Sequence, residues 1–571
     1  MNDAAFFTNP QHLWQKRYEA LRACYVDELT DEQVAQKFGY APGSVSQLRH
    51  MFRNGELDFS QPADGIGRRS ISPETRQLII NWRKQEYAAK DIVSLLAQAG
   101  VQVSVRTVER VLSDEGFSKL KRRTRRQQDT TKLGTSIAKP AQNLETEDLQ
   151  APIRFISPGA GVFLFAPLIA QLGLDEMVRE AQLPETKYIS AYGYVLSCLA
   201  LKLIGTERYA HAGDHAFDIG MGLFAGLTSI PKCTALSTYS YMLDQHHIHR
   251  LQEAFVRKVS QLGWYDGSVI NLDFHTAPHH GDQSVLETHW AGAKGKRMKG
   301  ALSLFAQDAQ TKLLLYGAAD IQRQEADDQI LEFLAFWKVI RSNDHPTFVF
   351  DSKLTTYMNL RKLDDRGIKF ITLRRRGKNL INSVDHLEGW KRITIDHGKR
   401  KHRQLQVHDS LIELRDYGKD IRQLVLLGNG REKPTFLVTN DTSSSAVQIV
   451  STYARRWRVE NGIAEAVKFF HLNALSSPIL IKVHFDLLMT VIADTLYWQL
   501  SQQLRGFEHC DAPKVYRHFV RGSATVQMKD REIAVIYNKR AHNPILRAVP
   551  WDQFPRTLPW LDGTRLTLKF K

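Results

Sequence analysis

The chain has 571 residues, of which 43% are hydrophobic, and a formal net charge of +16. This length is several times that of an ordinary domain of about 100 to 200 residues, and the hydrophobic content excludes a disordered chain, so we expect two or more folded cores. The positive charge favours a polyanionic partner, nucleic acid above all, although ribosomal and membrane-surface proteins share this charge.

The cysteines are few and far apart, which argues against a zinc ribbon and against a disulfide framework and fits a reducing cytoplasm. They are Cys24, Cys198, Cys233 and Cys510. We expect no secretory signal at the start of the chain. The apolar stretch 487–500 is interrupted by Asp494 and is too short to span a bilayer, so it predicts a buried core helix and no membrane association. The expected location is cytoplasmic and nucleoid-associated.

Residues 1–57 are predicted to form a helix-turn-helix module. Three helices are expected between Gln15 and Gly55, with Thr30 as an N-cap and a turn at GYAPG. If Val45 and Leu48 point into the core, the third helix presents a polar face to a DNA major groove. That face carries Ser44, Gln47, Arg49 and Arg53. The alternative is a small helical bundle with a charged outer face.

A linker at 58–71 and a second helix-turn-helix module at 72–126 follow. Arg68 and Arg69 in the linker can enter a minor groove or stay solvated. Ser72-Pro73-Glu74 begins the first helix of the module, and its basic tail is predicted to contact DNA phosphates. The tail residues predicted to bind DNA are Arg122, Arg123, Arg125 and Arg126. The polar segment 127–151 is a second predicted linker.

Residues 152–262 predict a mainly helical region that supports the core or forms dimer contacts. From Gly267 the pattern changes to strands, with Asp273 in the run GSVINLDFHT, and two further strands follow. A helix then leads to the strand TFVF, and Asp351 follows at once. The order strand, strand, strand, helix, strand, helix, strand is that of the ribonuclease H-like fold, in which Asp273 and Asp351 would lie on adjacent strands and share divalent metal.

The third carboxylate is expected from a later helix, for which the long pattern SAVQIVSTYARRWRVENGIAEAVKFF is the candidate. Tyr453, Arg456 and Glu460 are spaced by three and four residues, which places a metal ligand beside a phosphate-binding guanidinium on one helical face. For each carboxylate the alternative is a surface charge or a helix cap. Asp282, Asp344 and Asp364 are rejected as ligands on position. His275 would face the same way as Asp273, and packing behind the site is favoured over contact with metal or phosphate.

These motifs, LDFHT, FVFDSK, YARRWRVE and the tail PWLDGTRLTLKF, resemble those of the DDE transposases of bacterial insertion sequences. The resemblance is to the cut-and-paste group with a Tyr-x2-Arg-x3-Glu signature and a β-rich insertion, and it covers about residues 152–571. It implies catalytic and metal-binding roles for Asp273, Asp351 and Glu460. The Lys expected seven residues after the Glu is replaced by Val467. Lys468, the next residue, lies about 80° off the Glu460 face and is the candidate for the DNA phosphate contact.

The segment between Asp351 and Glu460 contains five strand-like runs, KRITI, HRQLQV, LIELR, RQLVLLG and PTFLVT, which predict the β insertion. In the group that the chain resembles, this insertion handles the transposon end. Trp390 is the tryptophan available there to stack on an unpaired base, and a core position is its alternative. The predicted bounds are 263–375 for the first part of the ribonuclease H-like core, 376–440 for the insertion, 441–505 for the core helices and 506–571 for a C-terminal region.

The predicted protein is therefore multidomain, with all-α DNA-binding modules before an α/β catalytic domain. We expect two Mg²⁺ or Mn²⁺ ions at the three carboxylates, DNA cleavage at element ends, and attack of the freed 3′-hydroxyl on target DNA. Tyr453 would contact phosphate without forming a covalent adduct. Double-stranded DNA is the expected partner, bridged by a homodimer. The alternatives are a domesticated transposase acting as a sequence-specific DNA-binding regulator, or a stand-alone ribonuclease H-like nuclease.

Overall fold

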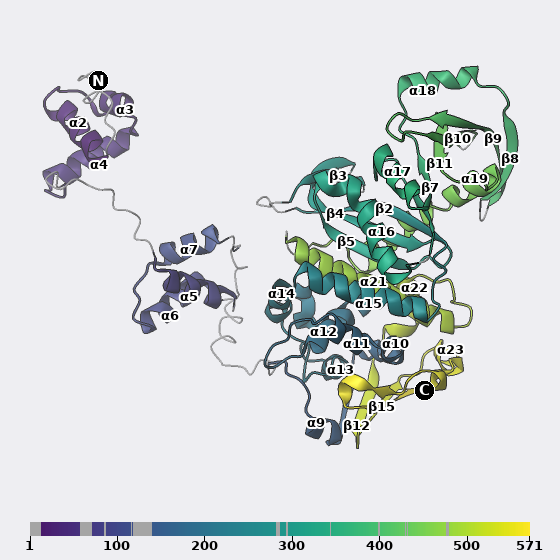
Figure 1. Ribbon diagram of the computed structural model, residues 1–571. Coiled ribbons are helices and arrows are strands. Elements are labelled where there is room, and N and C mark those ends of the chain that lie inside the picture. The colour runs from purple at the N-terminus through teal and green to yellow at the C-terminus, as the bar shows by residue number, and fades with distance from the viewer. Residues whose placement is uncertain are drawn as a thin grey trace. The chain divides into compact units, whose positions relative to one another are not determined.

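The computed structural model describes residues 13–57, 71–84, 87–115, 117, 140–280, 286–292, 295–342, 344–397, 400–428, 430, 432–475 and 479–571. The chain folds as two compact units, Met1–Leu133 and Gly134–Lys571 (Figure 1).

The first three-helix module comprises α2 (Leu13–Tyr25), α3 (Asp31–Phe38) and α4 (Pro42–Arg53). Thr30 begins α3 with a reciprocal capping box to Gln33, as its sequence predicts. Gly39 ends α3 at φ 64°, a left-handed conformation that costs glycine little. Val45 and Leu48 are buried against the other two helices, so the polar face of α4 remains outside.

The second three-helix module comprises α5 (Pro73–Lys84), α6 (Ala89–Gln98) and α7 (Val105–Asp114). Ser104 caps α7 by accepting a hydrogen bond from the Thr107 backbone N–H. Ile79, Ile92 and Val108 bring all three helices into one small core. Each module thus has its own apolar centre, which is what a short three-helix unit needs to fold.

In the second unit the short helix α9 (Thr146–Gln150) is followed by a strand, β1 (Ile153–Ser157), in the region that the sequence predicts to be mainly helical. Helices follow. The main ones are α10 (Ala166–Leu172), α11 (Leu174–Glu180), α12 (Ala191–Leu203), α13 (Ile219–Phe224), α14 (Cys233–Met242) and α15 (Gln245–Gln261). β1 pairs with a strand near the C-terminus, β12 (Ala524–Lys529), and this distant partner explains why local patterning did not predict the pairing.

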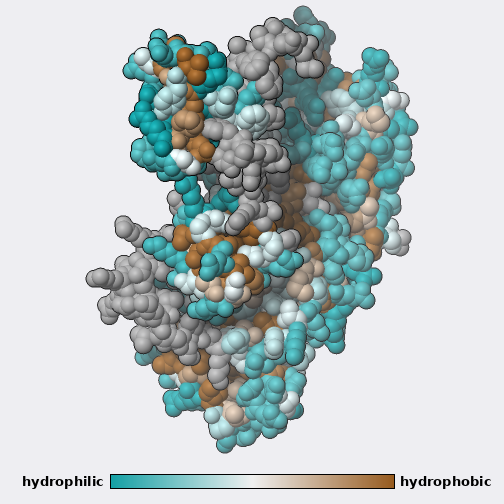
Figure 2. Space-filling view, turned by 90° about the vertical axis from the view of Figure 1, so that its left-hand side faces the viewer, coloured by the Kyte–Doolittle hydropathy of each residue, from teal (hydrophilic) through white to brown (hydrophobic). Residues whose placement is uncertain are grey.

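The long helix α21 (Leu480–Gln503) lies at the centre of this unit, against α12, α15 and the sheet strand β5 (Leu314–Ile321) (Figure 1). It is apolar on nearly all sides and buried along its length, as predicted for 487–500. Across the described part of the chain, no helix is both long enough and apolar enough to cross a membrane. Hydrophilic residues predominate on the face shown in Figure 2, with hydrophobic residues in smaller areas.

A mixed sheet carries the candidate catalytic residues. Its first strands are β2 (Val269–Pro278), β3 (Thr288–Ala291), β4 (Lys296–Asp308), β5, β6 (Thr347–Phe350) and β7 (Lys369–Leu373). β4 is antiparallel to both β2 and β5, while β6 is parallel to β2 and β7 is parallel to β6. The helix α16 (Gln329–Ile340) precedes β6, and α17 (Tyr357–Asp365) connects β6 to β7. The order β5-β4-β2-β6-β7 therefore places the strand that bears Asp273 beside the strand that ends at Asp351.

The sheet continues without a break into the predicted insertion. Its strands are β8 (Lys391–His397), β9 (Arg400–Glu413), β10 (Asp420–Leu427) and β11 (Thr435–Thr439). The five predicted runs form four strands, because HRQLQV and LIELR are both parts of the long strand β9. β11 pairs antiparallel with β7, so the insertion extends the same sheet. The short helix α18 (Lys378–Asn382) lies between β7 and β8 in the chain.

A second sheet closes the unit, with the strand order β1-β12-β13-β15-β14. Its C-terminal strands are β13 (Glu532–Tyr537), β14 (Thr557–Leu558) and β15 (Thr564–Phe570). The tail motif PWLDGTRLTLKF thus forms a turn and the strand β15, which pairs in parallel with β13. The motif has a structural place in this sheet, away from the candidate catalytic strands.

Candidate active site

The three predicted carboxylates line one pocket of about 520 Å³. Asp273 lies in the middle of β2, opposite Phe305 of β4. Asp351 follows Phe350, the last residue of β6, and Glu460 lies in the first turn of α20 (Trp457–Phe469). Because β2 and β6 are parallel neighbours and α20 packs against β2 and β4, residues from three distant segments meet here.

The helix before Glu460 is broken where the sequence predicts a continuous one. α19 (Ala446–Ala454) ends and α20 begins around Arg455 and Arg456. Backbone bonds there join residues three apart, as in the bond from Arg456 N–H to the Tyr453 carbonyl of 3.0 Å, so the chain winds more tightly than an α-helix. The prediction of one continuous helix is therefore wrong, but the three side chains still lie together, since the Arg456 guanidinium contacts Glu460 and lies 5.9 Å from the Tyr453 ring centre.

Arg456 bridges two of the three carboxylates. Its Nη1 donates to Asp273 Oδ2 at 3.1 Å, and its Nη2 donates to Glu460 Oε1 at 2.5 Å. Its side chain is 13% exposed, so this charge is largely withdrawn from water, whereas the Glu460 side chain is 53% exposed. The guanidinium thus occupies the space between Asp273 and Glu460 as a cation that neutralises both.

Burial dominates the electrostatics of Asp273. It raises the pKa of this carboxyl to about 6, with Arg456 acting to lower the pKa and the negative charges of Glu460 and Asp351 acting to raise it. A backbone hydrogen bond from Phe274 N–H to Asp273 Oδ1, at 3.0 Å, also favours the ionised form. A carboxylate in this environment gains from any additional cation brought into the pocket.

Asp351 is held at the end of its strand by its neighbour in the chain. Ser352 donates to Asp351 Oδ1 from its backbone N–H at 2.6 Å and from its hydroxyl at 3.2 Å. Lys353 and Leu354 continue the pocket wall. The carboxylate therefore has a fixed orientation at a point where the strand has ended and the backbone turns toward α17.

The donor set suits a hard divalent cation, because carboxylate oxygens are the ligands that Mg²⁺ and Mn²⁺ prefer. Within the described residues, no three acidic, histidine or cysteine side chains are grouped closely enough to hold a metal ion. The bridging position of Arg456 is a stand-in for such a cation between Asp273 and Glu460. The chemistry of this donor set fits a divalent cation, while Arg456 is paired with two of the three carboxylates.

Lys468 and Trp390, which the sequence predicts to contact DNA, do not line the pocket. Lys468 is exposed on α20, and the preceding residue, Val467, lines the pocket. Trp390 is partly buried in the insertion, where it packs on a small core of Val384, Val425 and Phe436 and donates from Nε1 to the Leu387 carbonyl at 2.8 Å.

The pocket also contains residues that the sequence did not single out, Trp290 above all. This tryptophan is 58% exposed on β3 and lines the pocket with the carboxylates. Asn473 is another, and its Oδ1 is hydrogen-bonded at 2.7 Å to His275, which the sequence analysis did consider. Burial lowers the pKa of His275 and favours its neutral form. The available signal for Trp290 was that it is the one large aromatic residue in the short run THWAG. Nothing in the sequence around Asn473 indicated that it would line the pocket.

In the first module, the predicted DNA-facing residues differ in their contacts. Gln47 is exposed. Arg49 forms an ion pair with Asp31 at 2.7 Å and lies 5.3 Å from the Tyr25 ring centre, and Arg53 donates to the Tyr25 hydroxyl at 3.1 Å. The other predicted DNA contacts lie outside the described residues. They are Arg68, Arg69, Arg122, Arg123, Arg125 and Arg126.

Comparison with known proteins gave one family match and a distant structural similarity. The family model described as "Transposase DDE domain" matches residues 264–496, which contain Asp273, Asp351 and Glu460. No curated protein matches the chain. A cryo-EM structure of the piggyBac transposase synaptic complex with hairpin DNA is similar at 10% identity, covering 63% of this chain and 79% of that chain with a TM-score of 0.34. Residues 264–496 of this chain are thus similar to the transposase DDE domain.

Proposed function

We propose that this protein is a DNA transposase that binds the ends of a mobile element, cuts the DNA there and joins the freed 3′ ends to target DNA. The observation that carries the proposal is the meeting of Asp273, Asp351 and Glu460 in one pocket of the DDE domain. The sheet order β5-β4-β2-β6-β7 supports the ribonuclease H-like assignment, because it makes the strands of the two aspartates parallel neighbours.

In this proposal Asp273, Asp351 and Glu460 would hold Mg²⁺ or Mn²⁺, two ions per active site. The ions would supply Lewis-acid stabilisation of the charge that develops on the phosphoryl group. Arg456 neutralises Asp273 and Glu460 until then, and it is positioned to turn its guanidinium to a DNA phosphate when the carboxylates find another cation. Asp351, fixed by Ser352, keeps its orientation throughout.

Cleavage transfers the phosphorus from the 3′ oxygen of the element end to a water oxygen, and the departing oxygen takes a proton. In joining, that 3′ oxygen attacks a phosphorus of the target, whose own 3′ oxygen leaves. Both steps displace one oxygen by another in line, so the same pocket serves for each. No side-chain nucleophile is needed, and Tyr453 is assigned a contact with phosphate.

The two three-helix modules are assigned to recognition of the element ends as helix-turn-helix units. The exposed face of α4, with Gln47 and the tethered Arg49 and Arg53, is the surface assigned to base reading. The net charge of +16 supports a substrate with many phosphates. Because both ends must be cut in step, the active species is proposed to be a homodimer that bridges two ends.

The test is a cleavage assay on a labelled duplex that ends in the element's own terminal sequence, in the presence of Mn²⁺, with nicking and plasmid joining scored separately. Wild-type protein is expected to do both, and Asp351→Asn neither. Asp365→Asn is the matched control, since Asp365 forms only an exposed pair with Arg361 and should leave both activities unchanged.

The other outcomes assign the protein differently. Metal-dependent nicking without joining would replace the transposase by a stand-alone nuclease. Specific binding to the duplex without nicking or joining, even with paired ends supplied, would replace it by a DNA-binding regulator.

A further inference from the structure

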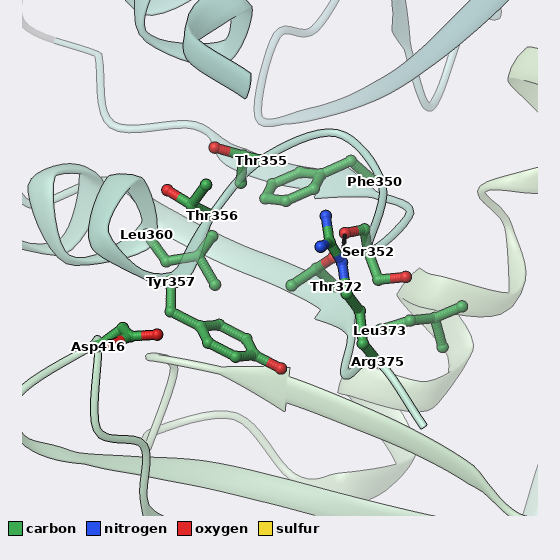
Figure 3. Close-up of a pocket in the computed structure, with 10 residues that line it drawn as sticks. All are labelled: Phe350, Ser352, Thr355, Thr356, Tyr357, Leu360, Thr372, Leu373, Arg375 and Asp416. Atoms are coloured by element: carbon green, nitrogen blue, oxygen red, sulfur yellow. Dashed lines mark hydrogen bonds between the residues drawn. The ribbon is translucent and has the colours of Figure 1, made fainter. Parts of the chain in front are cut away.

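A second, smaller pocket lies next to Asp351 in the chain, since Phe350 and Ser352 line it. It has a volume of about 210 Å³ and is bordered by the ends of β6 and β7, the start of α17, and Asp416 in the turn before β10 (Figure 3). Hydroxyl side chains from Ser352, Thr355, Thr356 and Thr372 line it, with one guanidinium, that of Arg375. Hydroxyls and a guanidinium are groups that bind phosphate oxygens.

Thr372 is the residue that points to a ligand. It lies on β7 and is only 2% exposed, yet its hydroxyl has no hydrogen-bond partner among the described residues. An unpartnered buried hydroxyl destabilises the fold, so such groups are rare unless a ligand or a function accounts for them. Thr355 and Thr356 differ, since Thr355 donates to the Asp327 carbonyl and Thr356 caps α17.

Two positive features converge on the same pocket. The first backbone N–H groups of α17, a nine-residue helix, have no partners within the helix and attract anions. Arg375 is exposed and is tied to the wall by a bond from its Nε to the Ser352 carbonyl at 3.2 Å. Figure 3 shows Arg375, Ser352 and Thr372 together, with Asp416, the acidic residue in the lining, at the opposite side beside Tyr357.

We propose that this pocket binds a DNA backbone phosphate close to the phosphate that is cut, through Thr372, Arg375 and the start of α17. The proposal rests on the proposed function for its substrate. Ser352 links the two pockets, since it donates to Asp351 Oδ1 and its carbonyl accepts from Arg375. A phosphate held here would therefore set the position of the DNA strand relative to the Asp351 carboxylate.

Thr372→Val provides the first test, because it keeps the shape of the side chain and removes only the hydroxyl. Loss of a buried group that lacks a partner should leave the thermal unfolding midpoint unchanged or raise it. Affinity for the end duplex, measured without divalent metal, should fall about tenfold because a hydrogen bond to a charged phosphate is lost. Wild-type affinity in this variant would overturn the proposal.

Arg375→Ala is compared with Arg376→Ala, a matched control at the next residue. Arg376 is also exposed, but it donates to the Pro434 carbonyl and does not line the pocket. An uncharged methylphosphonate is placed at each phosphate near the cut in turn. At one position the methylphosphonate should lower the affinity of wild type and of Arg376→Ala for the duplex about equally. It should not lower the affinity of Arg375→Ala any further, because the methylphosphonate and the substitution then remove the same contact. If no position separates the two variants, the proposal is wrong.

A final arm distinguishes a DNA phosphate from a free anion. Inorganic phosphate alone is titrated into wild type and Thr372→Val by calorimetry. Saturable binding that the substitution abolishes, with no sensitive methylphosphonate position, would reassign the pocket to a free anion and overturn the DNA assignment. Failure of the proposed function would look different, since wild-type protein would then fail to cut the end duplex at all.

Discussion

Trp290 and Trp390 lie in different environments, although sequence analysis considered only Trp390 for contact with DNA. Trp290 is exposed beside the three carboxylates, opposite Arg297 on the neighbouring strand β4. Trp390 is part of a small apolar core and has its N–H satisfied by a carbonyl. An aromatic ring that stacks on a base has to present a free face, and that condition favours Trp290.

The two residues should therefore respond differently to truncation. Trp290→Ala is expected to weaken binding of the end duplex by about 1–3 kcal/mol, the usual cost of losing one stacked base, with little change in the unfolding midpoint. Trp390→Ala should instead lower the stability of the fold by about 2–4 kcal/mol, because it opens a cavity beside Val425 and Phe436. Fluorescence anisotropy and thermal unfolding measure the two effects, and the opposite pattern would return the stacking role to Trp390.

At the scale of single residues, the sequence was informative where the position of a residue in the fold follows from the order of the strands. Asp273 and Asp351 were predicted because each lies on a strand whose place in the fold could be inferred, and both line the pocket. Lys468 was a weaker prediction, since a shift of one residue on a helix turns a side chain by about 100°, and Val467 faces the pocket in its place. Asn473 reaches His275 because the chain turns at His471, where φ is 54°. A histidine rarely adopts this left-handed conformation, so the sequence does not predict the turn.

Helix α19 leads the chain from the insertion back to Glu460, and the loop before it is organised by Asp441. Ser443 and Ser444 donate their hydroxyls and backbone N–H groups to this carboxylate, and Lys369 of β7 is paired with it at 3.2 Å. Burial acts to raise the pKa of Asp441, but the bonds from the two serines outweigh it and hold the pKa well below its usual range.

This pKa gives a pH-dependent prediction. A carboxyl whose pKa is lowered by folding stabilises the fold above its unfolded pKa, about 4, and loses that contribution as the pH falls toward the folded value. Asp441→Asn should therefore lower stability by about 1–3 kcal/mol at pH 7, and by progressively less below about pH 4. Urea unfolding at several pH values tests this, with the exposed Asp530→Asn as control. A difference independent of pH would contradict it.

The elements themselves were predicted well where their caps and periodicity are local. The N-cap at Thr30 and the buried run in α21 are examples, since both depend on neighbouring residues alone. The break between α19 and α20 was missed because YARRWRVE keeps a helical spacing without glycine or proline. In the structure Arg456, at the break, is paired with Asp273 on β2 and with Glu460 on α20.

On the scale of the whole chain, the start and the end of the second unit are joined. β1 pairs with β12, and the short 3₁₀ helix Ala160–Leu164 packs against the π-helical turn Tyr516–Val520. Sequence patterning could not predict this, because nothing local relates segments more than three hundred residues apart. The C-terminal region is thus a structural partner of the helical region as well as the end of the chain.

Gly161 makes this junction possible and offers a stability test. A Cβ atom at this position would lie 1.8 Å from the Val520 carbonyl oxygen, far inside van der Waals contact and against a backbone atom. Gly161→Ala should therefore cost about 2–4 kcal/mol of stability by forcing the two segments apart. Gly213→Ala is the control, because nothing lies within 4 Å of its Cβ position. Equal denaturant midpoints for the two variants would contradict the prediction, because they would show that the two segments can move apart at no cost in stability.

The pairing of β7 with β11 has a consequence for how such a protein changes over evolution. Leu373 and Leu437 are direct partners, so the chain leaves the sheet and returns to it at neighbouring positions. Topologically, everything between these strands is one enlarged hairpin loop. Segments can be gained, exchanged or trimmed at such a point without rethreading the rest of the sheet, since the two ends already meet. The length of this loop is therefore free to diverge among descendants that keep the same three carboxylates.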